Sequence, residues 1–212
     1  MAETFDGVLV TGAGRVALPP DVLLVRFGAE VVDTGVQQAL DGCNRAMAAM
    51  NAVLRDGGAA DADRQTSGAS LYQAHDQHGQ PRGWTASQDL TARLRDLGRA
   101  GDLITATIGA GGDAARLRTV NFDIDQASEA YRAARVKARR LAFDDARATA
   151  EQYASLAGRR LGVVISVQEG NAGYSPATQV RSMAFGAAES MPTEGGELDV
   201  RTTVEVRWEL LS

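Results

Sequence analysis

Two histidines have the side chains best suited to metal chemistry. His75 and His78 are the only histidines of the chain, and Asp76 lies between them. Two imidazoles and a carboxylate can hold a divalent metal ion. No further ligand of the right type is evident, and the surrounding turn residues place the pair at the tip of a hairpin. We therefore expect no specific metal site and no cofactor here.

A glycine-rich run near the N-terminus fits a second kind of site. Residues Gly12 to Ala17 match the G-x-G-x-x-G/A dinucleotide fingerprint after a strand. That motif must open a helix whose N-terminal amides hold the pyrophosphate. Here Pro19 and Pro20 follow, and a residue that precedes proline is disfavoured in the helical conformation. We expect a bend between two strands instead.

Two further side chains are single candidates for chemistry. Asp145 falls on a stripe of small residues in a long helix, where burial would raise the pKa of a catalytic acid. No nucleophile or second carboxylate is placed beside it, so we expect a buried hydrogen bond to a backbone amide or an arginine. Cys43 lies on the apolar stripe of another helix, where a buried thiol is inert. A single cysteine also excludes an intramolecular disulfide.

A cluster of basic side chains lies on the long helix and offers a site for acidic ligands. The net charge of the chain is −5, which argues against a general nucleic-acid binder. Solvation or ion pairs with a neighbouring subunit are the simpler interpretation. The cluster consists of Arg132, Arg135, Lys137, Arg139 and Arg140.

The long helix is predicted from Gln126 to Ala157, with Asp125 as its N-cap and Gly158 at the left-handed position that ends it. Val136 and Phe143 lie on its other face, among arginines, and are predicted to pack against another lobe or subunit. The small, mostly apolar stripe that should cover a sheet consists of Ala127, Tyr131, Ala134, Ala138, Ala142, Thr149 and Leu156.

The remaining patterns predict an α+β protein of two lobes. From Asp21 to Ile124 the order is strand, helix, strand, strand, helix, strand, which is that of a ferredoxin-like split βαβ plait. Runs 65–74 and 84–94 should pair as a hairpin. We expect the plait, residues 29–118, to be inserted into a second helix-on-antiparallel-sheet layer made of residues 1–28 and 119–212.

A long span without periodicity, residues 169–196, separates the last two predicted strands. Its length exceeds what is usual for loops in compact domains. Methionine and aromatic side chains are enriched where proteins meet. We predict that residues 174–191 dock on a neighbouring subunit or on a groove of the other lobe. The residues expected at this interface are Tyr174, Met183, Phe185 and Met191.

The order and spacing of several short runs resemble the SIMPL-like family, a bacterial family of poorly defined function. They include Thr11-Gly12-x-Gly14-x-Val16 with Pro20-Asp21, then Thr66-Ser67-Gly68-x-Ser70-Leu71. They also include Ala86-Ser87 with Leu90 and Arg95-Asp96-Leu97, the helical run from Asp145 through Ala157-Gly158, and the closing run from Gly195 to Leu210.

The resemblance implies a two-lobed α+β fold, frequent self-assembly and a link to oxidative-stress defence, with no known catalytic residues. It assigns structural roles to the signature residues Thr11, Gly12, Gly14, Pro20, Asp21, Asp145 and Gly158. Most members are exported, whereas residues 1–7 are acidic and contain no apolar segment typical of a signal peptide. The sequence as it stands therefore predicts a cytoplasmic protein, or an exported one if a leader has been removed.

Two classes of function remain open. The first is a non-enzymatic protein that self-assembles into a homo-oligomer or binds an unidentified protein partner. The second is a small hydrolase or metal-dependent enzyme that uses Asp145 or the pair His75 and His78. We favour the first, because the sequence lacks a Ser-His-Asp order and a closed metal set. No apolar run is long enough to span a membrane.

Overall fold

The computed structural model describes residues 7–75, 77–170 and 196–212. The chain forms two compact units. In the described residues, the first contains 7–19, 124–170 and 196–212, and the second contains 20–75 and 77–123. Each unit has one antiparallel sheet, and the described chain has three α-helices. The predicted α+β class is confirmed.

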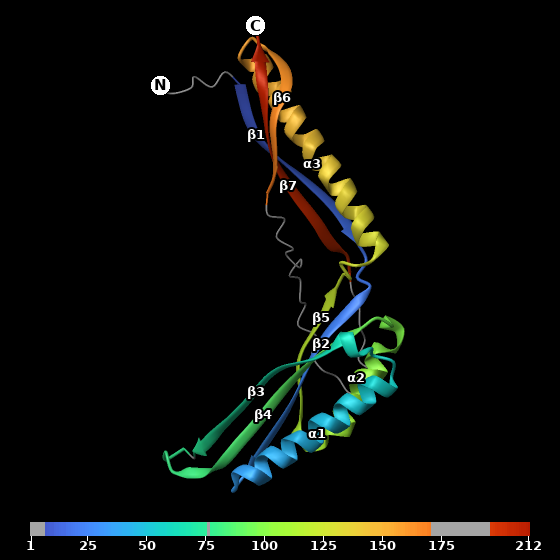
Figure 1. Cartoon of the computed structure of the whole chain (residues 1–212), viewed down its shortest axis with the longest axis vertical. Helices are drawn as coiled ribbons and strands as arrows, with labels where there is room; N and C mark the ends of the chain where they lie inside the picture. Colours follow the sequence, from blue (N-terminus) through green and yellow to red (C-terminus); the bar gives the residue numbers. More distant parts are fainter. Residues whose placement is uncertain (1–6, 76, 171–195) are drawn as a thin grey trace. The chain divides into compact units, whose positions relative to one another are not determined.

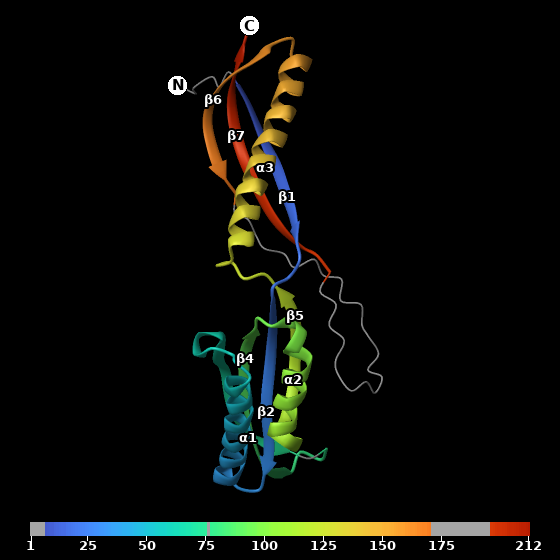
Figure 2. The same cartoon turned by 90° about the vertical axis from the view of Figure 1, so that its right-hand side faces the viewer.

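The first unit is a three-stranded sheet with one long helix on it (Figures 1 and 2). Its strands are β1 (Gly7–Leu18), β7 (Leu198–Leu211) and β6 (Arg160–Glu169), and the order β1-β7-β6 makes β1 and β6 the edges. Strand β7 alternates along its length, since its even-numbered residues from Leu198 to Trp208 are buried. Helix α3 (Glu129–Leu156) packs mainly on β1 and β7.

Helix α3 begins and ends on local signals. It begins later than predicted, because Ser128 rather than Asp125 caps it, and the Ser128 hydroxyl accepts a hydrogen bond from the Tyr131 N–H at 3.2 Å. Gly158 follows its end with φ of +67°, the left-handed conformation that was predicted. The predicted stripe was partly wrong, since Leu156 is 77% exposed. The buried stripe is alanine every fourth residue, from Ala134 to Ala154.

Strand β1 runs without a break through the glycine-rich run, so the predicted bend is wrong. Its glycines serve close packing instead. A Cβ atom on Gly12 would overlap the Ala142 carbonyl oxygen, and one on Gly14 would overlap that of Ala138. Only glycine therefore allows the alanine stripe of α3 to approach the backbone of β1 this closely.

The second unit is a four-stranded antiparallel sheet in the order β3-β4-β2-β5. Its strands are β2 (Val22–Asp33), β3 (Arg64–His75), β4 (Pro81–Leu94) and β5 (Ala115–Asp123). Helices α1 (Val36–Asp56) and α2 (Leu97–Gly111) lie on one face of this sheet (Figure 2), and short 3₁₀ turns, Asp61–Asp63 and Gly112–Ala114, precede β3 and β5. The predicted hairpin is confirmed, because β3 pairs with β4.

Pairing within this sheet decides where the units divide. Val22 pairs with Asp123 at one end of β2 and β5, and Ala29 pairs with Ala115 further along. Both strands therefore belong wholly to the second unit. The units divide at residues 19/20 and 123/124, whereas the sequence placed the boundaries at 28/29 and 118/119.

The core of the second unit is made of large side chains. Phe27 and Leu23 of β2 are completely buried, and the apolar stripe of α1, which includes the fully buried Met50, packs with them in one cluster. Cys43 belongs to this stripe and is buried, as predicted, with its thiol donating to the Ala29 carbonyl at 3.4 Å. Burial raises the pKa of the Cys43 thiol. That it is unreactive stays a prediction, for which rapid labelling in the native state is the test.

Candidate functional site

Asp145 lies where α3 meets the edge of the first sheet. Its Oδ2 atom accepts a hydrogen bond from the Ala13 N–H at 2.9 Å. The side chain is exposed, so the predicted burial is wrong, although the predicted bond to a backbone amide is present. The position lies on the flank of α3 beside β1 rather than on its alanine stripe. A carboxylate there satisfies a donor of the β1 edge.

The signature residues are spread over both units, where several of them hold backbone segments in place. Gly12 and Gly14 admit α3, Asp145 holds Ala13, and Gly158 follows the end of the helix. Thr11 is exposed on the face of β1 that points away from α3. Pro20 and Asp21 lie in the second unit, where the Asp21 N–H donates to the Asp123 carbonyl at 3.2 Å. These contacts favour a structural role for most of the signature residues.

Strand β6 is the other edge of the first sheet and differs from β1. It pairs with β7 on one side, and α3 makes few contacts with it. Two register irregularities, between Leu161 and Val164 and between Val164 and Ser166, interrupt the pairing. Four branched apolar side chains in a row of five are exposed, namely Val163 (68%), Val164 (42%), Ile165 (53%) and Val167 (55%). Such an apolar, open strand is a template for a further strand. We call its side away from β7 the β6 edge.

Glu169 at the end of β6 ties this strand to the helix. Its carboxylate accepts from Arg135 Nη2 at 3.0 Å and from Arg139 Nε at 3.1 Å. The pKa of Glu169 is lowered, mainly by the hydrogen bond from Arg139. The positive charge of Arg139 and the hydrogen bond and charge of Arg135 lower it further. Two members of the basic cluster are therefore ion-paired, and their partner is a carboxylate of the same chain rather than of a neighbouring subunit.

The two residues of α3 that were predicted to pack against another lobe or subunit have different surroundings. Val136 is 65% exposed. Phe143 is half-buried, and its ring centroid lies 6.0 Å from that of Trp208 with the planes tilted by 53°. Phe143 thus packs on β7 of its own unit. Tyr174, Met183, Phe185 and Met191 lie outside the described residues.

The histidine pair lies at the hairpin of β3 and β4. His75 ends β3 and is exposed, and His78 lies in the turn that follows, while Asp76 is outside the described residues. In the part of the chain that the structure describes, no three His, Cys, Asp or Glu side chains come together as a metal site. The geometry therefore adds no further ligand to the two histidines.

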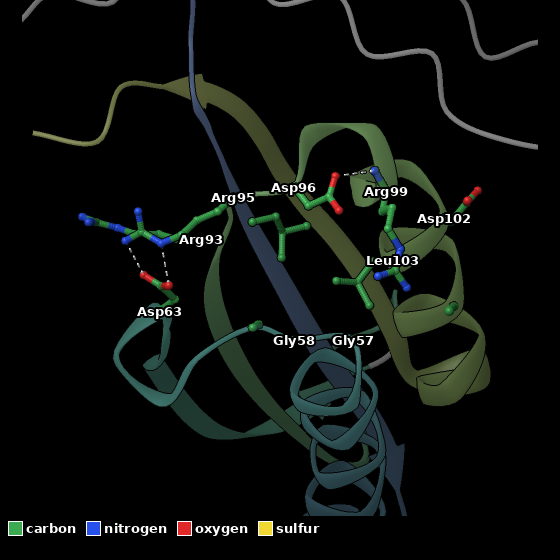
Figure 3. A pocket seen from close by; sticks show the side chains of 12 residues that line it. Gly57, Gly58, Asp63, Arg93, Arg95, Asp96, Arg99, Asp102 and Leu103 are labelled. Atoms are coloured by element: carbon green, nitrogen blue, oxygen red, sulfur yellow. Dashed lines mark hydrogen bonds and ion pairs between the residues drawn. The ribbon is translucent and has the colours of Figure 1, made fainter. Parts of the chain in front are cut away.

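Sequence reasoning missed a cavity of about 350 Å³ in the second unit, at the end of α1 and the start of α2 (Figure 3). Leu94, Leu103 and Gly57 are among its lining residues. Arg95 binds Asp63 through two hydrogen bonds, at 2.9 and 3.0 Å, and charges of both signs surround the opening. The six charged residues of the lining are Asp63, Arg93, Arg95, Asp96, Arg99 and Asp102. Among the described residues, the lining has no serine, cysteine, histidine or lysine that could act as a nucleophile.

Comparison with known families accounts for this framework. Residues 8–208 match the model of the SIMPL family, which is described as "Protein of unknown function (DUF541)". The chain belongs to the SIMPL family. Two relatives are the 26 kDa periplasmic immunogenic proteins of Brucella melitensis biotype 1 and Brucella abortus strain S19. Each is 27% identical over 220 residues, covering 96% of this chain and 84% of the relative.

The comparison corrects the expected location. The cytoplasmic prediction is wrong, because both SIMPL-family relatives are named as periplasmic proteins. It rested on the missing apolar segment in the first residues, a feature that says nothing about a processed chain. Within the described residues, no helix is long and apolar enough to cross a membrane.

Proposed function

We propose that this SIMPL-family protein is an exported, non-enzymatic protein that acts by forming a homo-oligomer. The observation that carries the proposal is the β6 edge, where four branched side chains are exposed on a strand that, among the described residues, pairs with β7 on one side only. Burying such side chains contributes about 25 cal/mol per Å² of apolar surface. The names of the periplasmic relatives support the exported location.

The contacts of the enzymatic candidates support the same conclusion. Asp145 is engaged with the backbone of Ala13, which favours a structural role for its carboxylate. A hydrolase would need a nucleophile within hydrogen-bond reach of a base. The proposal includes a role in oxidative-stress defence, which is implied by the resemblance to the family.

Two structural statements are also part of the proposal. We describe the second unit as a ferredoxin-like plait, supported by its order β3-β4-β2-β5 and by two helices on one face. We describe it as inserted into the first unit, since residues on both sides of it in the chain form the first sheet. Residues 174–191 and Val136 remain proposed interface elements.

Light scattering coupled to size-exclusion chromatography tests the function. The full chain is loaded over a wide range of concentrations, and the molar mass of the eluting species is compared with the 22.3 kDa of one chain. We expect a mass of at least two chains that falls on dilution. A single-chain mass at every concentration would overturn the proposal and would make the cavity beside α2 the next candidate for function.

A further inference from the structure

The β6 edge can bind one partner better than others, namely the same strand of a second copy. We propose that β6 pairs antiparallel with β6 of a second molecule, about a two-fold axis at Val164. The two three-stranded sheets would then form one continuous sheet of six strands. The inference rests on the proposed self-association and names its interface.

Unpaired backbone groups provide the first reason. An edge strand presents a row of free N–H and C=O groups that another strand can satisfy. The opposite edge is less available, because Asp145 occupies the Ala13 N–H and α3 packs over β1. Strand β6 has ten residues and few contacts with α3. Strand addition in the first unit is therefore favoured at β6.

The register follows from how β6 pairs with β7. Leu161, Val164 and Val167 pair with Leu210, Trp208 and Val206, which are alternate residues of β7. The three residues thus share one face and one hydrogen-bonding type. A two-fold axis at Val164 pairs equivalent positions only, with Leu161 opposite Val167 and Val164 opposite its own copy. The two register irregularities lie on either side of Val164. The same axis therefore places the irregularity on one side of Val164 opposite the irregularity on the other side in the second copy.

The side chains match in this register. Besides the pairs above, the axis sets Val163 opposite Ile165 and Gly162 opposite Ser166, so that every exposed branched residue meets an apolar one. Such cross-strand pairs stabilise a sheet. Four of the side chains that contribute are 42% to 68% exposed in the single chain. A two-fold axis closes the assembly at this edge and leaves no further free edge at β6.

Charge selects the antiparallel direction. The strand begins with Arg160, preceded by Arg159, and ends with Glu169. Antiparallel pairing brings the arginine end of one copy to the glutamate end of the other, whereas parallel pairing in register sets like charges opposite each other. In the single chain Arg159 donates to the Leu210 carbonyl, and Glu169 accepts from Arg135 and Arg139. The new contacts would extend these at the rim of the sheet.

Disulfide cross-linking tests the register. In Val164→Cys the two new thiols would lie opposite each other on the axis, within reach of a disulfide. In the matched variant Gln168→Cys each thiol would lie opposite Arg160 of the other copy, about eight residues or ~26 Å from its equivalent. Cys43 is buried and is common to both. Under mild oxidation of the full chain we expect at least about tenfold more cross-linked dimer, on the scale of a 1.4 kcal/mol preference, for Val164→Cys.

A charge variant gives an independent readout. Val164→Lys would place two ammonium groups on the axis, and we expect the dissociation constant of the oligomer to rise by about tenfold or more. Val32→Lys is the control, because Val32 is also an exposed strand valine, at 56%, but lies in the second unit. Light scattering measures both, and circular dichroism checks that both variants fold.

The outcomes separate this inference from the proposed function. Equal cross-linking at positions 164 and 168, or an unchanged oligomer in Val164→Lys, overturns the β6 pairing while the wild type still assembles. A wild type that has the mass of one chain at all concentrations overturns both proposals. Preferential cross-linking at position 164 together with weakened assembly in Val164→Lys supports the two-fold β6 interface.

Discussion

The two edges of the first sheet, β1 and β6, are built from the same kind of extended backbone but are protected very differently. Strand β1 carries Gly12 and Gly14 under the alanine stripe of α3, and Asp145 holds one of its backbone donors. Strand β6 carries four exposed branched residues, and ion pairs to α3 form at its end, at Glu169. One helix therefore covers two strands of a three-stranded sheet and leaves the third available.

The largest effect is expected from filling the space under α3. Gly14→Ala would put a methyl group into the Ala138 carbonyl, and backbone cannot give way as a flexible side chain can. Overpacking of this kind costs about 3 kcal/mol or more. Gly162→Ala on β6 is the matched change, since its Cβ would lie 3.0 Å from Glu209 Cβ, and it should cost about 1 kcal/mol or less. Chemical denaturation measures both. Equal losses would show that the two edges are packed alike.

Removing an aromatic ring between helix and sheet is expected to rank second. Phe143→Ala loses the contact with Trp208, and because the ring is half-buried the loss should be about 2 kcal/mol, below that of a fully buried ring. Val167→Ala on β6 should change the stability of the single chain by less than about 0.5 kcal/mol. A thermal scan at low protein concentration compares them. An unchanged midpoint for Phe143→Ala would mean that the ring contributes nothing to the unit.

Opening the protected edge should have a smaller effect on stability and a visible one on association. Asp145→Ala frees the Ala13 N–H and removes a hydrogen bond to a charged group, at a cost of about 1 to 2 kcal/mol. The β1 edge would then resemble the β6 edge, so higher-order species should increase in light scattering. Asp145→Asn keeps an acceptor oxygen, so its stability and its association should fall between those of Asp145→Ala and the wild type. Identical behaviour of all three proteins would show that Asp145 does not protect the β1 edge.

The smallest expected effect is a loss of folding stability at acidic pH. Arg139 and Arg135 hold the pKa of Glu169 below its usual value, and hydrogen bonds from Arg201 and Arg15 lower that of Asp199, which accepts from Arg15 Nε at 2.5 Å. Because the folded pKa values are lowered, the stabilisation is present above the unfolded pKa values of about 4 and is lost as the pH falls through the folded ones. Glu169→Gln should reduce this loss slightly. Denaturation midpoints at neutral and acidic pH measure this loss. A pH profile of Glu169→Gln identical to that of the wild type would show that the ion pairs of Glu169 do not contribute to stability.

The strongest periodic patterns predicted the structure well. The alternation of β7, the apolar stripe of α1 around Cys43 and the hairpin of β3 and β4 were readable because each pattern reports the burial of one face. The glycine-rich run was misread as a bend, because a glycine in a strand serves a turn or a close neighbour equally well in sequence. The cavity beside α2 left no signal, since its lining comes from distant segments.

By itself, the sequence determined the α+β class, the elements that alternate or repeat with helical period, and the membership that the SIMPL signature carries. These are local properties, set by side-chain polarity along one segment of chain. Only the tertiary structure decided which strands pair and which strand stays uncovered, because such contacts join residues far apart, as Ala13 and Asp145 do. The branched apolar residues of β6 remain exposed because α3 is too narrow to cover β1, β7 and β6 together.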